Sequence, residues 1–261
     1  MAELAIIGGS GFYQPGIFTD PQEIQVDTPY GAVHLLIGKA NGVEVAFIPR
    51  HGKEHSLLPH QLNYRANIWA LKEIGVKRII ATSAVGSLNR KCPPGTMVII
   101  DQFLDFTKQR PFTFFDKGDA FRAHVDMTAP YCPELRERIK RAAVTCKIPV
   151  QPEGCYVCAE GPRYETAAEI RMFQKLGGDV VGMTGVPEVV LARELGICYA
   201  AISTITNWAA GLSKHPLSHH EVVAVMKHNQ EKLRELILGC LTMTINGVFH
   251  CKCGQCNEGA K

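Results

Sequence analysis

Short apolar runs alternate with helical patterns along most of the chain, and this alternation constrains the fold more than any other feature. The runs that indicate strands span residues 4–7, 33–37, 43–48, 78–82, 97–100, 180–182 and 197–205. Most are continuously apolar, which is typical of strands buried on both faces. Helical patterns lie at 63–74, 134–146, 166–176 and 186–195, and from 219 or 221 to about 244. Strands that alternate with helices predict an α/β domain with a mixed central sheet.

Length, composition and charge exclude several other classes of protein. The 261 residues suit one or two domains, and α/β folds often run to about 250 residues as one. With 46% hydrophobic and 20% charged residues, the chain is neither mainly disordered nor a coiled coil. The net charge of +3 predicts no strong electrostatic attraction to nucleic acids or membranes. Neither a long apolar run nor a basic leader is visible, so a cytoplasmic location is expected.

Ten cysteines raise the question of disulfides and metals. Several lie in apolar or helical stretches, where small buried hydrophobes are expected: Cys92, Cys132, Cys146, Cys198 and Cys240. Cys155 and Cys158 form a C-x-x-C, but no second pair follows at zinc-ribbon spacing. A denser group lies near the end, comprising His250, Cys251, Cys253 and Cys256. It is typical either of a metal clip or terminal disulfide, or of a tail whose thiols have no role. A reducing cytoplasm favours free thiols.

Loops suited to anions follow three of the predicted strands. Residues 8–11 (GGSG) can bring backbone N–H groups close to an anion, and the Ser10 hydroxyl adds a donor. After the strand at 43–48, Arg50 can offer a planar fork to an oxyanion, with His51 as a further donor. Residues 82–88 (TSAVGSL) combine small hydroxyl side chains with a glycine. In open α/β sheets ligands bind at the carboxyl ends of the strands, so these loops predict a common anion site.

Two further segments carry polar groups suited to a heterocycle. Residues 160–166 (EGPRYET) form a rigid turn that delivers Tyr164 and Glu165 just before a predicted helix. Glu165 either stabilises the first helical turn or accepts an N–H from a ligand. Asn207 follows the strand at 197–205, where it either ends the strand or binds the edge of a heterocycle through its amide.

Taken together, these blocks resemble the nucleoside phosphorylase family that holds trimeric purine nucleoside phosphorylases and methylthioadenosine phosphorylases. The resemblance covers residues 5–244 and includes GGSG at 8–11, RHG at 50–52, NYRANIWAL at 63–71, SAVGSL at 83–88, EGPR at 160–163 and GMTGVPE at 182–188. It implies a single α/β domain whose twisted mixed sheet partly closes into a barrel flanked by helices. It also implies a homotrimer or dimer of trimers with sites at subunit interfaces. The domain would span residues 1–249, followed by a Cys-rich tail at 250–261.

The resemblance also assigns roles to individual residues. It implies a phosphate site made by Ser10, Arg50, His51, Ser83, Ala84 and Thr184, with Ala84 acting through its backbone N–H. Met183 would lie under the ribose, and the base would contact Tyr164, Glu165 and Asn207. A neighbouring subunit would lend His124 to the ribose end. Phosphate is the co-substrate, and no cofactor and no metal ligand are implied.

Three positions depart from the methylthioadenosine branch of this family. That branch has a serine where this chain has Glu165, an aspartate at Asn207 and an apolar residue at His219. The physics of a 6-oxopurine fits the residues present: Glu165 would accept from N1–H, and the Asn207 amide would donate to O6 or N7. His219 would bind a ribose 5′-hydroxyl, where an alkylthio group would require an apolar wall. These positions predict cleavage of inosine and guanosine, with Asn207 and Glu165 as the catalytic pair.

Other functions also fit parts of the sequence. Phosphorolysis of 5′-methylthioinosine or 5′-methylthioadenosine is the nearest alternative. A nucleotide-binding oxidoreductase that uses residues 8–11 would need a following helix and a ribose-binding acid, and neither is evident. A metal-dependent interaction module built on the tail would leave the other blocks unexplained.

Overall fold

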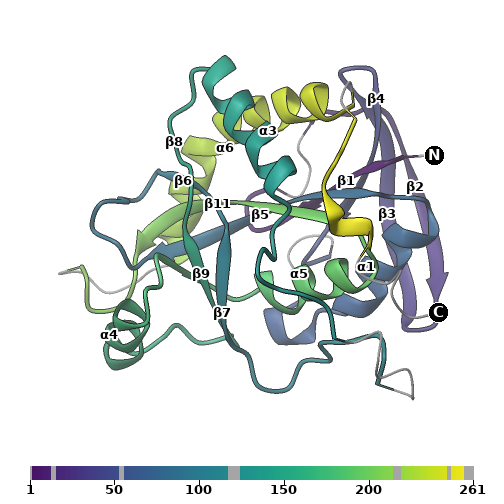
Figure 1. Ribbon diagram of the computed structural model, residues 1–261. Coiled ribbons are helices and arrows are strands. Elements are labelled where there is room, and N and C mark those ends of the chain that lie inside the picture. The colour runs from purple at the N-terminus through teal and green to yellow at the C-terminus, as the bar shows by residue number, and fades with distance from the viewer. Residues whose placement is uncertain are drawn as a thin grey trace.

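The computed structural model describes residues 2–12, 16–52, 56–116, 124–213, 219–245 and 248–255. Within the central sheet, strand β5 (Arg78–Ser87) makes the most extensive contacts with other strands. One edge of β5 pairs in parallel with β1 (Leu4–Gly8) over residues 78–81 and then antiparallel with β10 (Val180–Gly182). The other edge pairs in parallel with β11 (Cys198–Trp208) along almost its whole length. The sheet therefore branches at β5 (Figure 1).

The remaining strands extend these branches. Beyond β1 lie β4 (Val43–Pro49), β3 (Gly31–Ala40) and β2 (Thr19–Thr28). Beyond β10 lie β9 (Cys155–Ala159) and β7 (Gln102–Phe106), and beyond β11 lie β6 (Met97–Ile99) and β8 (Val150–Gln151). Among the described residues these pairings form no ring. The mixed α/β sheet is confirmed, but the expectation of partial barrel closure is wrong, because the branches that leave β5 end on separate strands.

Helices pack on both faces of the sheet and create two apolar cores (Figure 1). One face carries α1 (Tyr64–Glu73) and α5 (Gly185–Glu194), and the other carries α3 (Pro133–Thr145) and α6 (His219–Ile245). The sequence of β1 is continuously apolar because Ala5 and Ile7 enter one core while Leu4 and Ile6 enter the other. A smaller core forms under α4 (Ala167–Lys175).

The predicted helices are all present, with ends within about two residues of the expectation. The missed strands are β2, β7, β8 and β9. β2 was missed because six of its first eight residues are polar or proline, so no apolar run marks this strand at the exposed edge of the sheet. β7 lies in a segment rich in polar and aromatic residues and is only half-buried. Within the described residues, no helix is long and apolar enough to cross a membrane.

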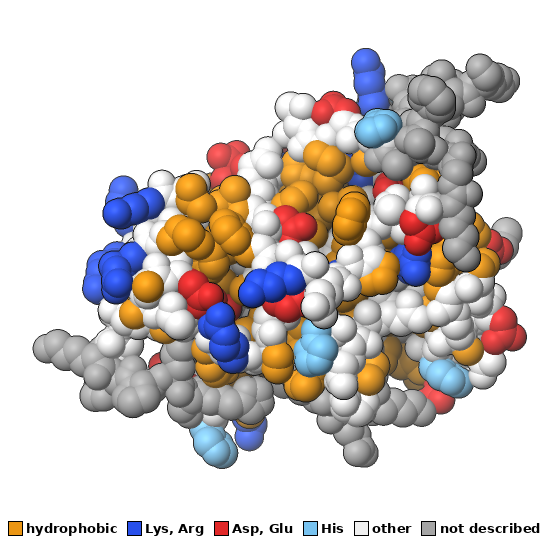
Figure 2. Space-filling view, turned by 90° about the horizontal axis from the view of Figure 1, so that it is seen from below, with side chains coloured by type: hydrophobic (Ala, Val, Ile, Leu, Met, Phe, Trp, Pro, Cys, Tyr) orange, Lys and Arg blue, Asp and Glu red, His pale blue; other side chains and the backbone are white. Residues whose placement is uncertain are grey.

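The surface seen in Figure 2 mixes charges of both signs with apolar patches. Lysine and arginine side chains on this face stand beside acidic ones, and no broad basic field covers it. This face therefore agrees with the small net charge of +3. Exposed large apolar side chains include Leu57, Leu58 and Phe112.

Candidate functional site

A pocket of about 430 Å³ lies where four parallel strands reach their carboxyl ends. β1, β4, β5 and β11 run in the same direction, so the loops or last residues of each meet at one edge of the sheet. The volume is in the range of small-molecule sites. The pocket is lined by most of the residues that the sequence singled out: Ser10, Arg50, His51, Ser83, Ala84, Tyr164, Glu165, Met183, Thr184 and Asn207.

Two predicted residues are not among the lining. His124 is exposed and lies outside this pocket within the chain. His219 is the first residue of α6, but its side chain lies outside the described residues. Val222, three residues later on the same helix, does line the pocket. The start of α6 therefore borders the site, and the position of the His219 imidazole stays a prediction.

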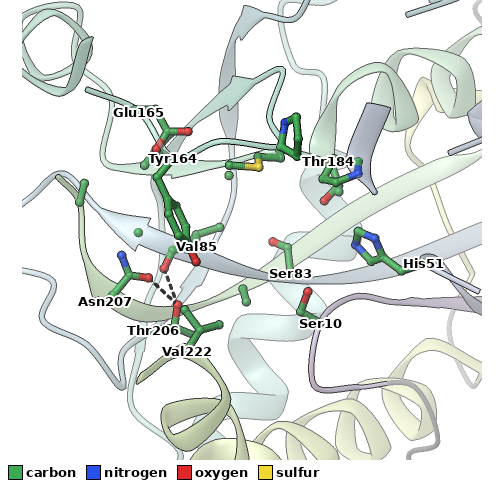
Figure 3. Close-up of a pocket in the computed structure, with 18 of the residues that line it drawn as sticks. Ser10, His51, Ser83, Val85, Tyr164, Glu165, Thr184, Thr206, Asn207 and Val222 are labelled. Carbon is green, nitrogen blue, oxygen red and sulfur yellow. Dashed lines mark hydrogen bonds between the residues drawn. The ribbon is translucent and has the colours of Figure 1, made fainter. Parts of the chain in front are cut away.

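Hydroxyl and imidazole groups gather at one end of the pocket, where Figure 3 shows Ser10, Ser83, His51 and Thr184. Ser83 Oγ lies 2.8 Å from Ser203 Oγ, and His51 Nδ1 lies 2.8 Å from the Leu57 carbonyl oxygen. These contacts orient the two side chains before any ligand binds. The arrangement suits a tetrahedral oxyanion, so we call it the anion end.

Arg50 reaches this end but already has a strong partner. Its Nε donates to Glu188 Oε2 and its Nη2 to Glu188 Oε1, both at 2.7 Å, while Nη1 donates to the Thr82 carbonyl at 2.7 Å. The Tyr199 hydroxyl donates to Glu188 Oε1 at 2.7 Å. Both side chains of the ion pair are 1% exposed. Burial lowers the pKa of the Arg50 guanidinium, but the Glu188 carboxylate outweighs it and holds that pKa above its ordinary value. Arg50 therefore keeps only part of its donor fork for a ligand.

Gly9 is required where the first loop crosses β5. A Cβ at this position would lie 2.3 Å from the Thr82 carbonyl oxygen and 2.8 Å from Arg50 Nη1. The Gly9 amide donates to Thr82 Oγ1 at 3.0 Å. The absence of a side chain thus lets the loop that carries Ser10 pack directly on the Arg50 guanidinium.

The opposite end carries Tyr164, Glu165 and Asn207, and we call it the base end (Figure 3). Glu165 is 9% exposed, and its Oε1 has no hydrogen-bond partner among the described residues. Burial raises the pKa of the Glu165 carboxyl. Tyr164 is 41% exposed and leaves this end partly open. A buried acceptor without a partner is costly, and a ligand N–H would complete it.

A β-bulge aims Asn207 into the pocket. The register of β11 against β5 shifts between Ile205 and Asn207, so Thr206 is an extra residue with no partner in the ladder. The Thr206 hydroxyl lies 2.8 Å from Asn207 Oδ1 and 3.2 Å from the Val85 carbonyl (Figure 3). Asn207 Nδ2 donates to the Trp208 carbonyl at 3.0 Å. With the amide assigned in this orientation, its second N–H is available to a ligand.

Sequence reasoning missed the residues that support the site. Thr206, Glu188 and Tyr199 receive no role from the sequence, yet they orient Asn207 and Arg50. Glu188 lies inside the GMTGVPE block, which was the only available signal. Nothing local in the sequence pairs it with Arg50, 138 residues away.

Comparisons with known proteins agree with this geometry. Residues 3–242 match the family model described as Phosphorylase superfamily. The chain is 54% identical to a probable 6-oxopurine nucleoside phosphorylase of Moorella thermoacetica, with 90% of each chain covered. It is 53% identical to an S-methyl-5′-thioadenosine phosphorylase of Pyrococcus horikoshii, with 91% of each covered. Among solved structures, a methylthioadenosine phosphorylase from Schistosoma mansoni in complex with adenine has a TM-score of 0.92 at 33% identity, covering 99% of this chain and 97% of that one.

Proposed function

The chain belongs to the phosphorylase superfamily, and from that premise we propose that it cleaves 6-oxopurine ribonucleosides such as inosine and guanosine with phosphate, releasing the free base and ribose 1-phosphate. Overall identity does not choose between the two activities named above, since the values are 54% and 53%. The polar groups at the base end of the pocket favour a 6-oxopurine. The observation that carries the proposal is Glu165 Oε1, which has no hydrogen-bond partner among the described residues and belongs to a side chain that lines the same pocket as Asn207.

Phosphorolysis needs positioning and charge stabilisation more than a protein nucleophile. Phosphate attacks C1′ of the ribose as the bond to the purine nitrogen breaks, so the sugar becomes oxocarbenium-like and negative charge develops on the base. Ser10, His51, Ser83 and Thr184 would hold the phosphate under C1′, with the backbone of Ala84 and the remaining Arg50 donors. Met183 would lie against the ribose. The spare Asn207 N–H would donate to O6 or N7 of the departing base.

The hydrogen-bonding groups of a 6-oxopurine, N1–H on one side and O6 and N7 on the other, match Glu165 and Asn207 at the base end. N1–H is a donor, and Glu165 Oε1 is a buried acceptor without a partner among the described residues. Adenine instead presents a bare N1 lone pair to the carboxylate and an amino group to the Asn207 N–H. Each mispaired buried polar group costs about 1–3 kcal/mol. Two mismatches should therefore favour inosine over adenosine by well over tenfold.

Phosphorolysis of 5′-methylthioinosine is the second candidate, and Val222 is the observation that favours it. This apolar side chain lines the pocket at the start of α6, where an alkylthio group would find an apolar contact. We keep inosine as the preferred substrate because His219, one turn earlier on α6, would supply a polar partner for a 5′-hydroxyl.

We further propose a homotrimer or a dimer of trimers that works in cytoplasmic purine salvage. Among the described residues the pocket wall is partly open, since Leu58 and Tyr164 line it while 44% and 41% exposed. A neighbouring subunit that lends His124 would close this side. Exposed Leu57 and Phe112 would also be covered in such an assembly. Light scattering after gel filtration measures the stoichiometry.

The test of the activity is a comparison of substrates with and without phosphate. Purified protein is incubated with inosine, guanosine, adenosine, 5′-methylthioadenosine or 5′-methylthioinosine, and free base and sugar phosphate are quantified. We expect release of hypoxanthine and guanine only when phosphate is present. Comparable kcat/KM for adenosine and inosine would overturn the base assignment. Preference for 5′-methylthioinosine over inosine would overturn the role of His219.

A further inference from the structure

Four cysteine thiols from three distant parts of the chain meet at one point outside the pocket. The Sγ atoms of Cys132, Cys198, Cys251 and Cys253 all lie within 4.8 Å of one another. Cys198 Sγ and Cys251 Sγ are 3.3 Å apart, and all four are free thiols. A tetrahedral zinc site with Zn–S bonds of about 2.3 Å has sulfur atoms about 3.8 Å apart. The cluster therefore has the size of a tetrathiolate site.

Regular elements hold the first two thiols. Cys132 is the N-cap of α3, and its Sγ accepts a hydrogen bond from the Leu135 amide at 3.4 Å. Cys198 is the first residue of β11. Amide N–H donors to sulfur are a common second layer around metal thiolates because they stabilise the negative charge. Two ligands are thus placed by the body of the domain.

The other two thiols come from the C-terminal segment, which packs on the domain. Cys253 lies in the short helix η3 (Lys252–Gln255) and is 3% exposed. Glu134 Oε2 accepts from the amides of His250 and Cys251 at 2.8 and 3.0 Å. The Phe249 ring packs under two guanidinium groups, those of Arg78 and Arg138, at 4.1 and 4.2 Å from its centroid. Residues 248–255 are therefore anchored along a defined path.

The approach of this segment to the turn before β11 is very close. A Cβ at Gly196 would lie 3.3 Å from Gly254 Cα and 3.6 Å from the Cys253 carbonyl oxygen, and Gly196 has φ +68°. Glycine at both positions brings the C-terminal backbone directly against the start of β11. This contact places Cys253 close to Cys198. Cys256 lies outside the described residues.

The surroundings suit the negative charge that thiolates bring. The N-terminus of α3 adds the positive end of its dipole beside Cys132. Several thiolates packed this closely would still repel one another. A divalent cation with a preference for sulfur removes that repulsion.

We propose that Cys132, Cys198, Cys251 and Cys253 bind one Zn²⁺ as a structural tetrathiolate that fastens the C-terminal segment to the domain. The site is separate from the pocket. Cys198 and Asn207 stand nine residues apart on β11, which is about 30 Å at 3.3 Å per residue. A closed set of four protein sulfurs leaves no position for a substrate, which is the mark of a structural zinc. Binding would release the remaining thiol protons to solvent.

The experiment measures metal and thiol state in the full-length protein, purified with reductant and supplied with Zn²⁺. Inductively coupled plasma mass spectrometry and native mass spectrometry should find one tightly held zinc per chain. Replacement by Co²⁺ should give the absorption of a tetrahedral thiolate complex. Cys251→Ser should lose the metal and lower the Tm, while inosine turnover below the Tm stays within about twofold. Cys146→Ser, outside the cluster, should keep the metal.

Three results overturn the proposal, and the first two do not depend on how a variant folds. The first is wild-type protein whose cluster thiols are reduced and reactive yet take up no Zn²⁺ or Co²⁺. The second is protein whose native mass shows paired disulfides in place of metal, even under reductant. The third is zinc that remains at full occupancy in folded Cys251→Ser and Cys253→Ser variants.

Discussion

The two ends of the pocket are built on different principles. At the anion end, Arg50 and Glu188 are paired, Ser83 faces Ser203, and His51 faces a backbone carbonyl. At the base end, Glu165 Oε1 has no partner among the described residues. The anion end is thus organised by the folded chain itself. The base end leaves polar capacity that a ligand must complete.

This difference separates stability from specificity. Hydrogen bonds already made within the chain contribute to folding, so changes at the anion end should affect both the fold and phosphate binding. An unpaired buried group costs about 1–3 kcal/mol in the free protein. That cost is recovered only when a ligand with the right donor binds, so changes at the base end should alter substrate choice with little loss of stability.

The largest effect is expected at the ion pair of the anion end. Arg50→Ala leaves Glu188, which is 0% exposed, as an uncompensated buried charge. Breaking such a pair costs about 3–5 kcal/mol, which chemical denaturation measures. The Arg50→Ala/Glu188→Gln double variant removes the stranded charge and should recover part of that stability.

The double variant also isolates the role of Arg50 toward phosphate. In the folded double variant, the phosphate KM should still rise more than tenfold, since charge-assisted hydrogen bonds contribute about 1.5–3 kcal/mol. The KM for inosine at saturating phosphate should change much less. An unaltered phosphate KM in this folded protein would remove Arg50 from the anion site.

The next effect tests the base end. Asn207→Ala should lower kcat for inosine by about 10²–10³, because a donor to developing charge is lost. The phosphate KM and the midpoint of denaturation should stay close to wild type.

Asn207→Asp is the matched variant. One oxygen of the new carboxylate would face the Trp208 carbonyl, which lies 3.0 Å from Nδ2 in the wild type, unless the carboxylate is protonated. It should lose inosine turnover and gain relative preference for adenosine. Equal kcat in Asn207→Ala and wild type contradicts the assignment.

Sequence reasoning found the two ends unequally, and the reason is physical. The strand-end loops carry Ser10, Arg50 and Ser83 in short local motifs, so both the pattern and the family resemblance point to them. The hydrogen bonds that fix them are long-range. The Arg50 partner lies 138 residues away, and the bulge at Thr206 appears only when β11 is aligned on β5.

The same limit applies to the fold. Continuous apolar runs identified β1, β4 and β5, because strands buried on two faces need no polar alternation. β2 was invisible because it is an exposed edge strand. The open, branched sheet could not be predicted, since it depends on which edge of β5 each later strand joins. The cysteines near the C-terminus form a dense group in the sequence, but Cys132 and Cys198, which meet them in the fold, lie in apolar or helical stretches that predict only core residues.

A smaller effect is expected from Glu165, whose Oε1 has no partner among the described residues. Glu165→Gln keeps the shape but replaces a charge-assisted acceptor by a neutral one, so kcat/KM for inosine should fall about tenfold. The amide can donate to a bare N1, so preference should move toward adenosine. The folded state no longer buries a charge, and the variant should be at least as stable as wild type near neutral pH. A clear loss of stability would show that Glu165 has an internal partner.

The pH dependence of kcat/KM and of stability should also differ between Glu165→Gln and wild type. Burial raises the pKa of Glu165, so its acceptor form appears above the ordinary glutamate value of about 4.3. Wild-type kcat/KM for inosine should therefore rise through that raised pKa, and this limb should vanish in Glu165→Gln. The free energy of unfolding should change with pH in the opposite direction. Because the pKa of Glu165 is raised in the folded state, folding favours the protonated form, so wild type should lose stability relative to Glu165→Gln as pH rises through the same range. Parallel curves for the two proteins would contradict both statements.

The smallest effect concerns the orientation of the Asn207 amide. Thr206 Oγ donates to Asn207 Oδ1 at 2.8 Å, which turns Nδ2 toward the Trp208 carbonyl and leaves one N–H for the base. Thr206→Val removes this donor at nearly constant volume, so the amide loses the contact that distinguishes its two ends. One neutral hydrogen bond contributes about 0.5–1.5 kcal/mol, so kcat for inosine should fall about fivefold. Thr206→Ser retains the hydroxyl and should restore most of kcat. Since the bulge itself is a backbone feature, neither variant should alter the phosphate KM. A loss of kcat in Thr206→Ser with none in Thr206→Val would mean that packing of the Thr206 methyl group, and not its hydroxyl, positions Asn207.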